Sequence, residues 1–307
     1  MDGIVIVDKP KGISSQEAVD RVKKILKIKR AGHTGTLDPF ATGVLPVCLG
    51  KATKIIPFLD EELKEYEAVL RLGITTDTMD LTGRVLCEKE VGHIEEERVK
   101  EVFSELTGVI AQTPPMFSAL KKDGVRLYKL AREGKSVERP ARKVIIYELK
   151  LLELNPPFIR FFVRCSRGTY VRVLGYDIGM KLGCGGHLVE LRRIRSGQFS
   201  IEDSVSIEDI KRGIFKLIDM NQALSHLKEV KLKSKEMATL IRQGRQIEKS
   251  YLNLSLLPEF SVGDKLRVCC NSDLVAVVES LVESSNLDKL HDRYKVLKLL
   301  RVFDNQS

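Results

Sequence analysis

The 307-residue sequence predicts an α+β protein with a mixed, largely antiparallel sheet flanked by helices, plus a small C-terminal β domain. The length is sufficient for one large and one small domain, each able to bury a core. Up to residue 228, segments with strand and helix periodicity are interspersed. From residue 229, short apolar strands alternate with turns rich in Gly, Asn, Asp and Ser. We therefore predict domains over residues 1–228 and 229–307.

The individual elements follow from apolar periodicity and from turn residues. Strands are predicted at residues 3–7, 65–72, 84–87, 144–154, 158–165, 266–270, 274–282 and 294–303. Residues 44–49 form an apolar run, and residues 188–194 are expected to be a strand or extended chain. Helices are predicted at residues 15–26, 94–106, 171–182 and 235–242, with shorter ones at 127–133 and within 206–227. Residues 112–142 have weak periodicity and many basic side chains, which indicates an insertion.

The charge distribution favours a polyanionic partner. Lys and Arg number 51 against 42 Asp and Glu, a net charge of +9. Residues 21–30 hold six basic side chains, and residues 112–147 hold nine basic against three acidic. Nucleic acid is the obvious polyanion, although solvated helix faces can carry similar charge.

Several classes of protein are disfavoured by what the sequence lacks. No apolar run approaches the roughly 20 residues of a membrane-spanning helix, and the N-terminus does not resemble a signal peptide, so we expect a cytoplasmic protein. The six cysteines form no C-x-x-C pair, which predicts reduced thiols without a zinc site. P-loop, zinc-deaminase, G-x-S-x-G and H-E-x-x-H signatures are absent. A cofactor-free or Asp-centred reaction is thus favoured.

Residues 32–43 form the most distinctive stretch, Gly-His-Thr-Gly-Thr-Leu-Asp-Pro-Phe-Ala-Thr-Gly. Its three glycines permit unusual backbone geometry, and Pro39 stiffens the chain directly after Asp38. Leu37 and Phe40 place apolar bulk on either side of the carboxylate. A single acid on a stiff loop suits an enzyme that needs one positioned nucleophile. An ordinary Asx turn with an exposed Asp is the alternative interpretation.

This stretch resembles the catalytic motif of the TruB family of tRNA pseudouridine synthases, and the match extends to residue 53. Further matches are Lys-Pro-Lys-Gly at residues 9–12, Pro-Pro-Met-Phe-Ser-Ala-Leu-Lys at 114–121 and Cys-Ser-Arg-Gly-Thr-Tyr-Val-Arg at 165–172. The resemblance is strong over residues 1–200. It implies the pseudouridine synthase fold, and the last segment is similar to the PUA-type RNA-binding domain of bacterial members.

The activity that the resemblance implies is isomerisation of a uridine inside RNA. The glycosidic N–C bond breaks, the base turns and a C–C bond forms, without metal or organic cofactor. For bacterial members the target is the uridine at position 55 in the T-arm loop of tRNA. By resemblance Asp38 is the nucleophile, attacking either the ribose or the base.

The resemblance also implies the surroundings of Asp38. A buried carboxylate alone would be protonated, so a cation should lie beside it, and the family assigns that role to Arg172. Tyr66 would stack on the flipped uracil and accept its C5 proton. Tyr170 would line the same pocket and Leu191 would close it. The alternatives are a surface arginine for Arg172, a core or rim position for Tyr66 and ordinary core packing for Leu191.

Two further site residues are implied near the flipped base. His33, in the Asp38 loop, would help to extrude the base, and Asp80 would act either in base extrusion or in hydrogen bonding near the pocket. An ordinary loop histidine and an exposed loop aspartate are the alternatives. Base flipping costs a few kcal/mol, which phosphate contacts must offset. Residues 112–142 would be the arm that grips the RNA, and the predicted phosphate contacts are Lys9, Lys54, Lys121, Lys122, Arg126, Lys129 and Arg132.

The predicted partner is thus the T-arm stem-loop of tRNA, bound by a monomer that needs no protein partner and no membrane. Two other functions fit the same sequence. One is a catalytically silent RNA chaperone or binding module, against which the intact Asp38, Tyr66 and Arg172 argue. The other is an RNA-guided rRNA pseudouridylase similar to archaeal and eukaryotic relatives, against which the short C-terminal domain and the basic insertion argue.

Overall fold

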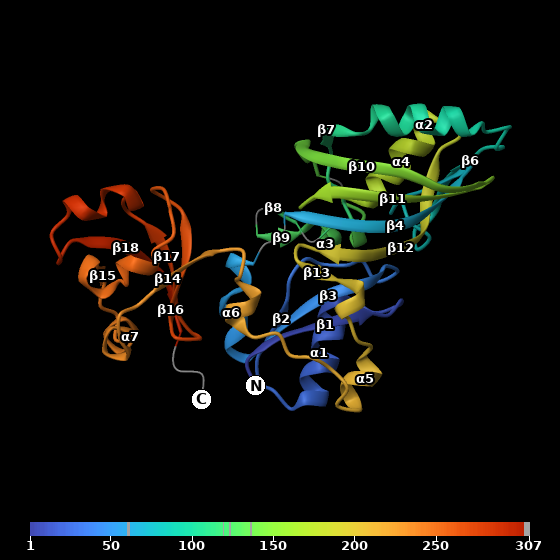
Figure 1. Cartoon of the computed structure of the whole chain (residues 1–307). Coiled ribbons are helices and arrows are strands. Elements are labelled where there is room, and N and C mark those ends of the chain that lie inside the picture. Colours follow the sequence, from blue (N-terminus) through green and yellow to red (C-terminus); the bar gives the residue numbers. More distant parts are fainter. Residues whose placement is uncertain (60–61, 119, 123, 136, 304–307) are drawn as a thin grey trace.

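The main body of the protein is built on a nine-stranded sheet (Figure 1). The computed structural model describes residues 1–59, 62–118, 120–122, 124–135 and 137–303. Along the sheet the strands follow the order β1 (Gly3–Lys9), β3 (Thr42–Leu49), β12 (Gly186–Ser196), β4 (Leu63–Leu72), β11 (Phe158–Ser166), β10 (Arg142–Asn155) and β7 (Gly108–Gln112). Two short strands extend it, β2 (Ala31–His33) on β3 and β13 (Phe199–Ser200) on β12.

The sheet nearly divides in two between β3 and β12. These strands are parallel and share only the pairs Arg192–Thr42 and Arg193–Gly43, whereas the other strand pairs of this sheet are antiparallel. Gly43 is required at the junction, because its φ is 101° and a Cβ there would lie 2.1 Å from the carbonyl oxygen of Arg193. The predicted mixed, largely antiparallel sheet is confirmed. Because β3 and β12 pair over only two residues, the loop before β3 can lie between them.

Helices cover both halves of this sheet. Helix α1 begins where the Ser14 hydroxyl accepts a hydrogen bond from the Glu17 amide, and it buries Val19 and Val22 against the sheet. In Figure 1, α1 and α5 lie by β1, and α2 and α4 lie over β10 and β11. The helices of the main body are α1 (Ser15–Leu26), α2 (Glu96–Glu105), α4 (Val171–Lys181), α5 (Ile207–Lys211) and α6 (Met220–Ala223).

The basic insertion leaves and rejoins the sheet at one point. Gln112 at the end of β7 is paired with Arg142 at the start of β10. Strand β7 was not predicted from the sequence, because five residues after a helix carry too little alternation to be recognised. The insertion holds β8 (Lys121–Lys122), β9 (Val125–Arg126) and α3 (Leu127–Arg132), and the other small sheet is β5 (Ile74–Thr76) with β6 (Val85–Glu88).

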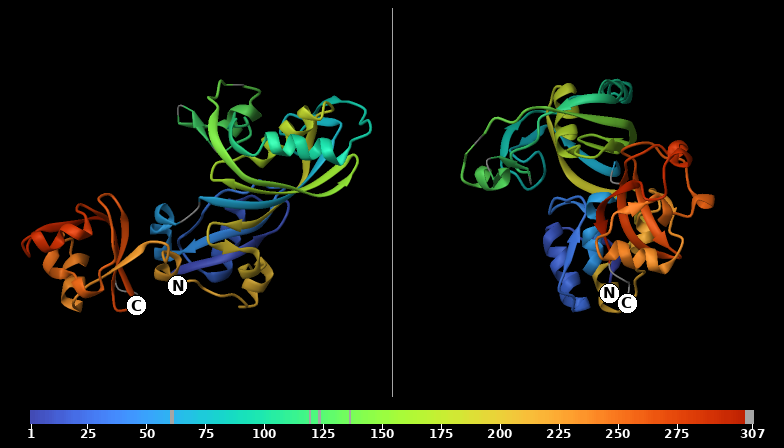
Figure 2. Two further views of the ribbon diagram at one scale, coloured as in Figure 1. Left: turned by 45° about the horizontal axis from the view of Figure 1, so that its top comes forward. Right: turned by 90° about the vertical axis from the view of Figure 1, so that its left-hand side faces the viewer.

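The C-terminal segment forms its own five-stranded sheet beside the first (Figure 2). The strands follow the order β14 (Lys228–Lys231), β16 (Lys265–Cys270), β17 (Asp273–Ser280), β18 (Lys295–Val302) and β15 (Ile247–Glu248), with helix α7 (Lys235–Arg242). The boundary after residue 228 stays a prediction. A buried apolar cluster joins the two parts, and it includes Ile4, Cys48, Ile55, Met220, Cys269, Val277 and Phe303. None of the six cysteines, all of which lie within the described residues, forms a disulfide bond. Within the described residues no helix is long and apolar enough to cross a membrane.

Candidate active site

The backbone of the Asp38 loop is hydrogen bonded to the segment that joins β1 to α1 and to the start of α1. The Ser15 hydroxyl donates to the Leu37 carbonyl at 3.0 Å and accepts from the Leu37 amide at 2.8 Å. The Gly12 amide donates to the Pro39 carbonyl at 2.8 Å. Both neighbours of Asp38 are therefore fixed in place, as a preorganised nucleophile requires.

Lys9 belongs to this support and not to an RNA-binding surface. Its side chain is fully buried, and its ammonium donates to the carbonyl oxygens of Pro10, Ile13 and Pro39 at 2.9, 2.8 and 3.4 Å. Burial lowers the pKa of Lys9 to about 8. The prediction that Lys9 contacts RNA phosphates was wrong, because the ammonium is enclosed by the loop that it stabilises.

Arg172 lies beside Asp38, as the resemblance implies. Its Nε is 2.8 Å from Oδ2 of Asp38 and its Nη2 is 3.2 Å from Oδ1, so both carboxylate oxygens face the guanidinium. Arg172 is 3% exposed and Asp38 34% exposed. The remaining donors of Arg172 reach the carbonyls of Thr78 and Phe117 at 2.8 and 2.9 Å. The surface alternative for Arg172 is thereby ruled out.

Asp80 completes the cluster from the loop between β5 and β6. Its Oδ2 lies 3.3 Å from Nη1 of Arg172, and its Oδ1 accepts from the Thr78 hydroxyl and the Thr82 amide at 2.8 and 2.9 Å. Asp80 is 3% exposed, so the exposed-loop alternative does not hold. The buried guanidinium of Arg172 therefore forms ion pairs with two carboxylates, those of Asp38 and Asp80.

The surroundings of Asp38 raise the pKa of its carboxyl overall, although individual groups act in opposite directions. Burial raises the pKa of the Asp38 carboxyl, and Arg172 acts in the opposite direction, whereas Asp80 raises this pKa further. Arg172 is thus the principal group that favours the ionised form of Asp38. An ionised carboxylate with little water around it is a competent nucleophile.

Asp38 opens into a cavity of about 560 Å³. The same cavity is lined by the side chains of Tyr66, Tyr170, Leu191 and His33, so the structure brings together all the predicted pocket residues except Asp80, which lies behind Arg172. Burial raises the pKa of Tyr66 and of Tyr170, so both phenols are neutral at rest. The roles of these residues remain predictions.

Three residues of the site were not predicted from the sequence. Lys64 and Arg193 are buried and line the cavity. Gln112 accepts from the Tyr170 amide at 2.9 Å and donates to its carbonyl at 3.1 Å, which fixes the start of α4. One signal was available for Arg193, since it follows Leu191 by two residues on a strand and so faces the same side.

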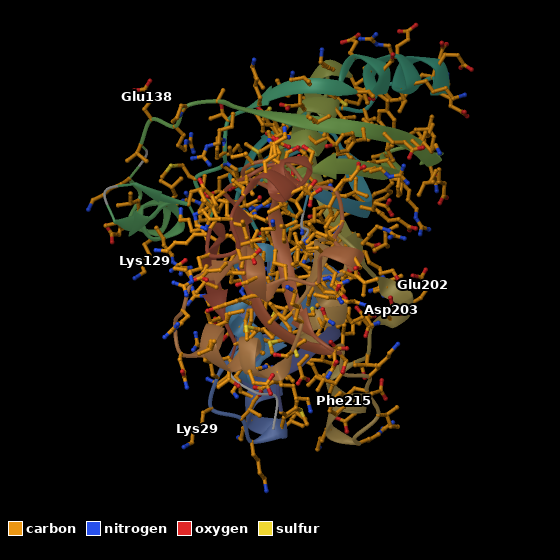
Figure 3. The ribbon with its side chains drawn as sticks, turned by 60° about the vertical axis from the view of Figure 1, so that its left-hand side comes forward. Lys29, Lys129, Glu138, Glu202, Asp203 and Phe215 are labelled. Carbon is orange, nitrogen blue, oxygen red and sulfur yellow. The ribbon has the colours of Figure 1, made fainter. Side chains whose placement is uncertain are left out.

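The predicted phosphate contacts outside the cavity are only partly described. Lys54 is half-buried on the 3₁₀ helix Gly50–Lys54, and Arg126 and Lys129 are exposed on the insertion. Figure 3 shows Lys129 and Glu138 projecting from the insertion. The side chains of Lys121, Lys122 and Arg132 lie outside the described residues. In the described ranges no group of three His, Cys, Asp or Glu side chains could hold a metal ion.

Solved structures share this architecture over the whole chain. The Cbf5–Nop10–Gar1 complex matches with a TM-score of 0.73 at 28% identity, covering 98% of this chain and 84% of that one. An H/ACA ribonucleoprotein bound to a substrate RNA containing 2'-deoxyuridine matches with a TM-score of 0.75 at 27% identity, covering 99% and 86%. The fold is that of a pseudouridine synthase.

Sequence relatives give the particular family. Residues 23–171 match the N-terminal domain of the TruB family pseudouridylate synthases, and residues 172–232 match the tRNA pseudouridylate synthase B C-terminal domain. The tRNA pseudouridine synthase B of Geobacter sulfurreducens is 44% identical over 99% of this chain and 100% of its own length. That of Clostridium tetani is 43% identical over 94% and 99%. The chain belongs to the TruB family, which confirms the resemblance and the predicted fold.

Proposed function

We propose that the protein converts the uridine at position 55 in the T-arm loop of tRNA to pseudouridine, with Asp38 as the nucleophile. The observation that carries this proposal is the Asp38 carboxylate, paired with buried Arg172 at the wall of a cavity that Tyr66 and Tyr170 also line. A tRNA substrate is supported by the relatives, which are tRNA pseudouridine synthases.

The chemistry needs few groups. The uracil must leave the base stack and enter the cavity, where an aromatic ring stabilises it by stacking. Asp38 attacks either the ribose or the base, and the glycosidic bond breaks. After the base turns, its C5 bonds to the sugar and loses a proton. The site residues Leu191 and His33 line the space in which the base would turn.

The RNA would be held by basic side chains around the cavity and on the insertion. Exposed Arg126 and Lys129 are placed to meet phosphates, with PUA-like residues 229–307 as a second contact. The division into a catalytic domain over residues 1–228 and an RNA-binding domain over 229–307 is part of the proposal.

Tritium release tests the target position. A T-arm stem-loop carries tritium at C5 of the target uridine only, and a matched stem-loop of the same sequence carries it at another loop uridine. We expect release from the first RNA and none from the second, and none from either with Asp38→Asn. Release from the second RNA alone would overturn the T-arm assignment. Release by Asp38→Asn would remove Asp38 from the nucleophile role.

A further inference from the structure

Arg193 on β12 is a buried cation whose role is not accounted for by the nucleophile and its partner. It is 1% exposed, and within the described part of the chain it forms no ion pair with a carboxylate. Its Nε donates to the Val44 carbonyl at 2.8 Å and its Nη2 to the Gly35 carbonyl at 2.9 Å. A charge removed from water without a counter-ion is costly, so its presence in this cavity needs a reason.

The residue directly opposite Arg193 is Tyr66. The two are partners in the antiparallel pairing of β4 with β12, so their side chains lie on the same face, with Cβ atoms roughly 4.5–5.5 Å apart. Both side chains line the cavity that contains Asp38. The Arg193 guanidinium acts against the rise in the pKa of Tyr66 that burial produces. This buried cation thus faces the phenol that is expected to handle a proton.

The hydrogen bonds of Arg193 also connect this pair to the nucleophile. Gly35 and Val44 stand on either side of the segment that carries Asp38, so the guanidinium holds both ends of the loop. Arg193 therefore fixes the separation between the carboxylate on the loop and the phenol on β4. A displacement of one group relative to the other by about 1 Å can cost on the order of 100-fold in rate.

We propose that Arg193 is a positioning residue that stabilises the ionised phenol of Tyr66, so that this oxygen takes the C5 proton in the last step. The inference rests on the proposed function. Once C5 has bonded to the sugar, C5 carries both the sugar carbon and a hydrogen. The proton passes to the phenolate oxygen and the C5–H electron pair forms the C5–C6 double bond. The Tyr66 phenol, neutral at rest, gives its proton to water before this step, the C5 proton then restores the neutral phenol, and N1 takes a proton from water.

The alternative is that Arg193 only clamps the Asp38 loop. A clamp would slow every step that depends on Asp38 and would leave the proton step unchanged relative to the others. An electrostatic partner of Tyr66 would instead slow deprotonation selectively. The isotope effect at C5 separates the two, because it rises only when breaking of the C5–H bond becomes rate-limiting.

The experiment compares T-arm stem-loops that carry protium or deuterium at C5 of the target uridine, under single-turnover conditions across pH. For Arg193→Gln we expect a rate reduced about 100-fold. We also expect a larger C5 isotope effect than in the wild type, and activity displaced to higher pH because the phenol ionises less readily. Arg193→Lys should restore part of the rate. Tyr66→Phe should be as slow, and the double variant no slower than either single variant.

Controls keep this outcome separate from the proposed function. Inactivity of the wild type on these RNAs would refute the proposed function itself, whereas a normal wild type with Arg193→Gln slowed at an unchanged isotope effect and pH profile would refute the role of Arg193. Thermal unfolding and RNA affinity are measured for each variant. If Arg193→Gln does not fold, the isotope effect of Arg193→Lys decides: a wild-type value contradicts the proposal.

Discussion

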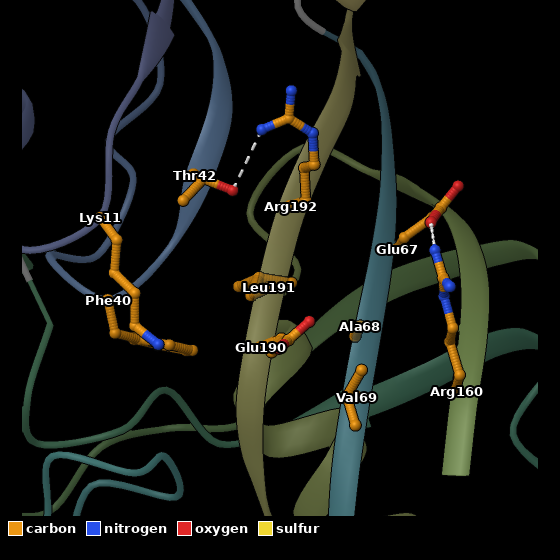
Figure 4. A pocket seen from close by; sticks show the side chains of 10 residues that line it. All are labelled: Lys11, Phe40, Thr42, Glu67, Ala68, Val69, Arg160, Glu190, Leu191 and Arg192. Carbon is orange, nitrogen blue, oxygen red and sulfur yellow. Dashed lines mark hydrogen bonds and ion pairs between the residues drawn. The ribbon is translucent and has the colours of Figure 1, made fainter.

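Two hollows share Leu191 but differ in how they hold charge. The cavity at Asp38 lies on the Tyr66 side of β4. The other hollow, of about 260 Å³, is lined by Glu67, which neighbours Tyr66 and points to the opposite face (Figure 4). The two hollows differ in volume, and they also differ in how their ionised groups are held.

At the second hollow two arginines form exposed ion pairs with carboxylates. Arg160 lies 2.6 Å from Glu67, and Arg192 lies 2.7 Å from Asp8, with every partner at least 30% exposed. Such pairs are worth little, because water already solvates them. Around Asp38 the cations Lys64, Arg172 and Arg193 are buried, although Arg167, which also lines the cavity, is exposed. Among the described residues Arg193 has no carboxylate partner. Buried charged side chains, and not the presence of a hollow, therefore distinguish the active site from the second hollow.

Among the substitutions that test this difference between the two hollows, removal of Arg172 should reduce the reaction rate most. Arg172→Gln removes the main group that lowers the pKa of Asp38 and leaves only the smaller effect of Lys9 against burial and Asp80, which raise it. Asp38 is then protonated up to a higher pH, so the acid limb of the pH–rate profile should move to higher pH. We expect a loss of about 10²–10³-fold in rate at neutral pH. An acid limb at the wild-type position would contradict this, and Arg172→Lys is the charge-retaining control.

Removal of the Gln112 side chain should be the next largest change. Gln112→Ala leaves the amide and carbonyl of Tyr170 without their partner at the start of α4. The expected loss is about 1–3 kcal/mol in the free energy of unfolding, measured by urea denaturation. Gln112→Glu retains the acceptor and loses the donor, so its free energy of unfolding should lie between those of the wild type and Gln112→Ala. Wild-type stability for Gln112→Ala would show that the two backbone groups find other partners.

Neutralising the insertion should weaken RNA binding without changing the chemistry. Arg126→Gln with Lys129→Gln should reduce the slope of log affinity against log salt by about one for each phosphate that the variant no longer binds. The single-turnover rate at saturating RNA should stay the same. Lys100→Gln on α2, also an exposed lysine, is the matched control and should leave the slope unchanged. A double variant with the wild-type slope would remove these two residues from the interface.

The smallest effect should come from the second hollow. Arg160→Gln breaks an exposed ion pair with Glu67, and we expect less than about 1 kcal/mol in stability and a rate within about twofold of the wild type. The measurements are thermal unfolding and tritium release. A loss of rate comparable to that of Arg172→Gln would contradict the proposed difference between the two hollows.

The sequence predicted the site residues that belong to short local motifs, and it missed those whose contacts depend on how distant strands pair. Asp38, its stiff loop and α4 with Arg172 follow from motif and periodicity over short stretches. Gln112 and Arg193 act on partners 58 and 127 residues away, through pairings that β7 and β12 make in the folded sheet. Lys9 was assigned to RNA because its charge suggests a surface. Only the folded loop shows the three carbonyl oxygens that enclose it.

The central claim is that Asp38, held ionised by Arg172, performs the attack. The direct test is single-turnover tritium release from a T-arm stem-loop by the wild type and by Asp38→Asn, an isosteric change, with RNA affinity measured for both. We predict release by the wild type and none above background by Asp38→Asn at similar affinity. Release by Asp38→Asn at a rate near that of the wild type would contradict the claim.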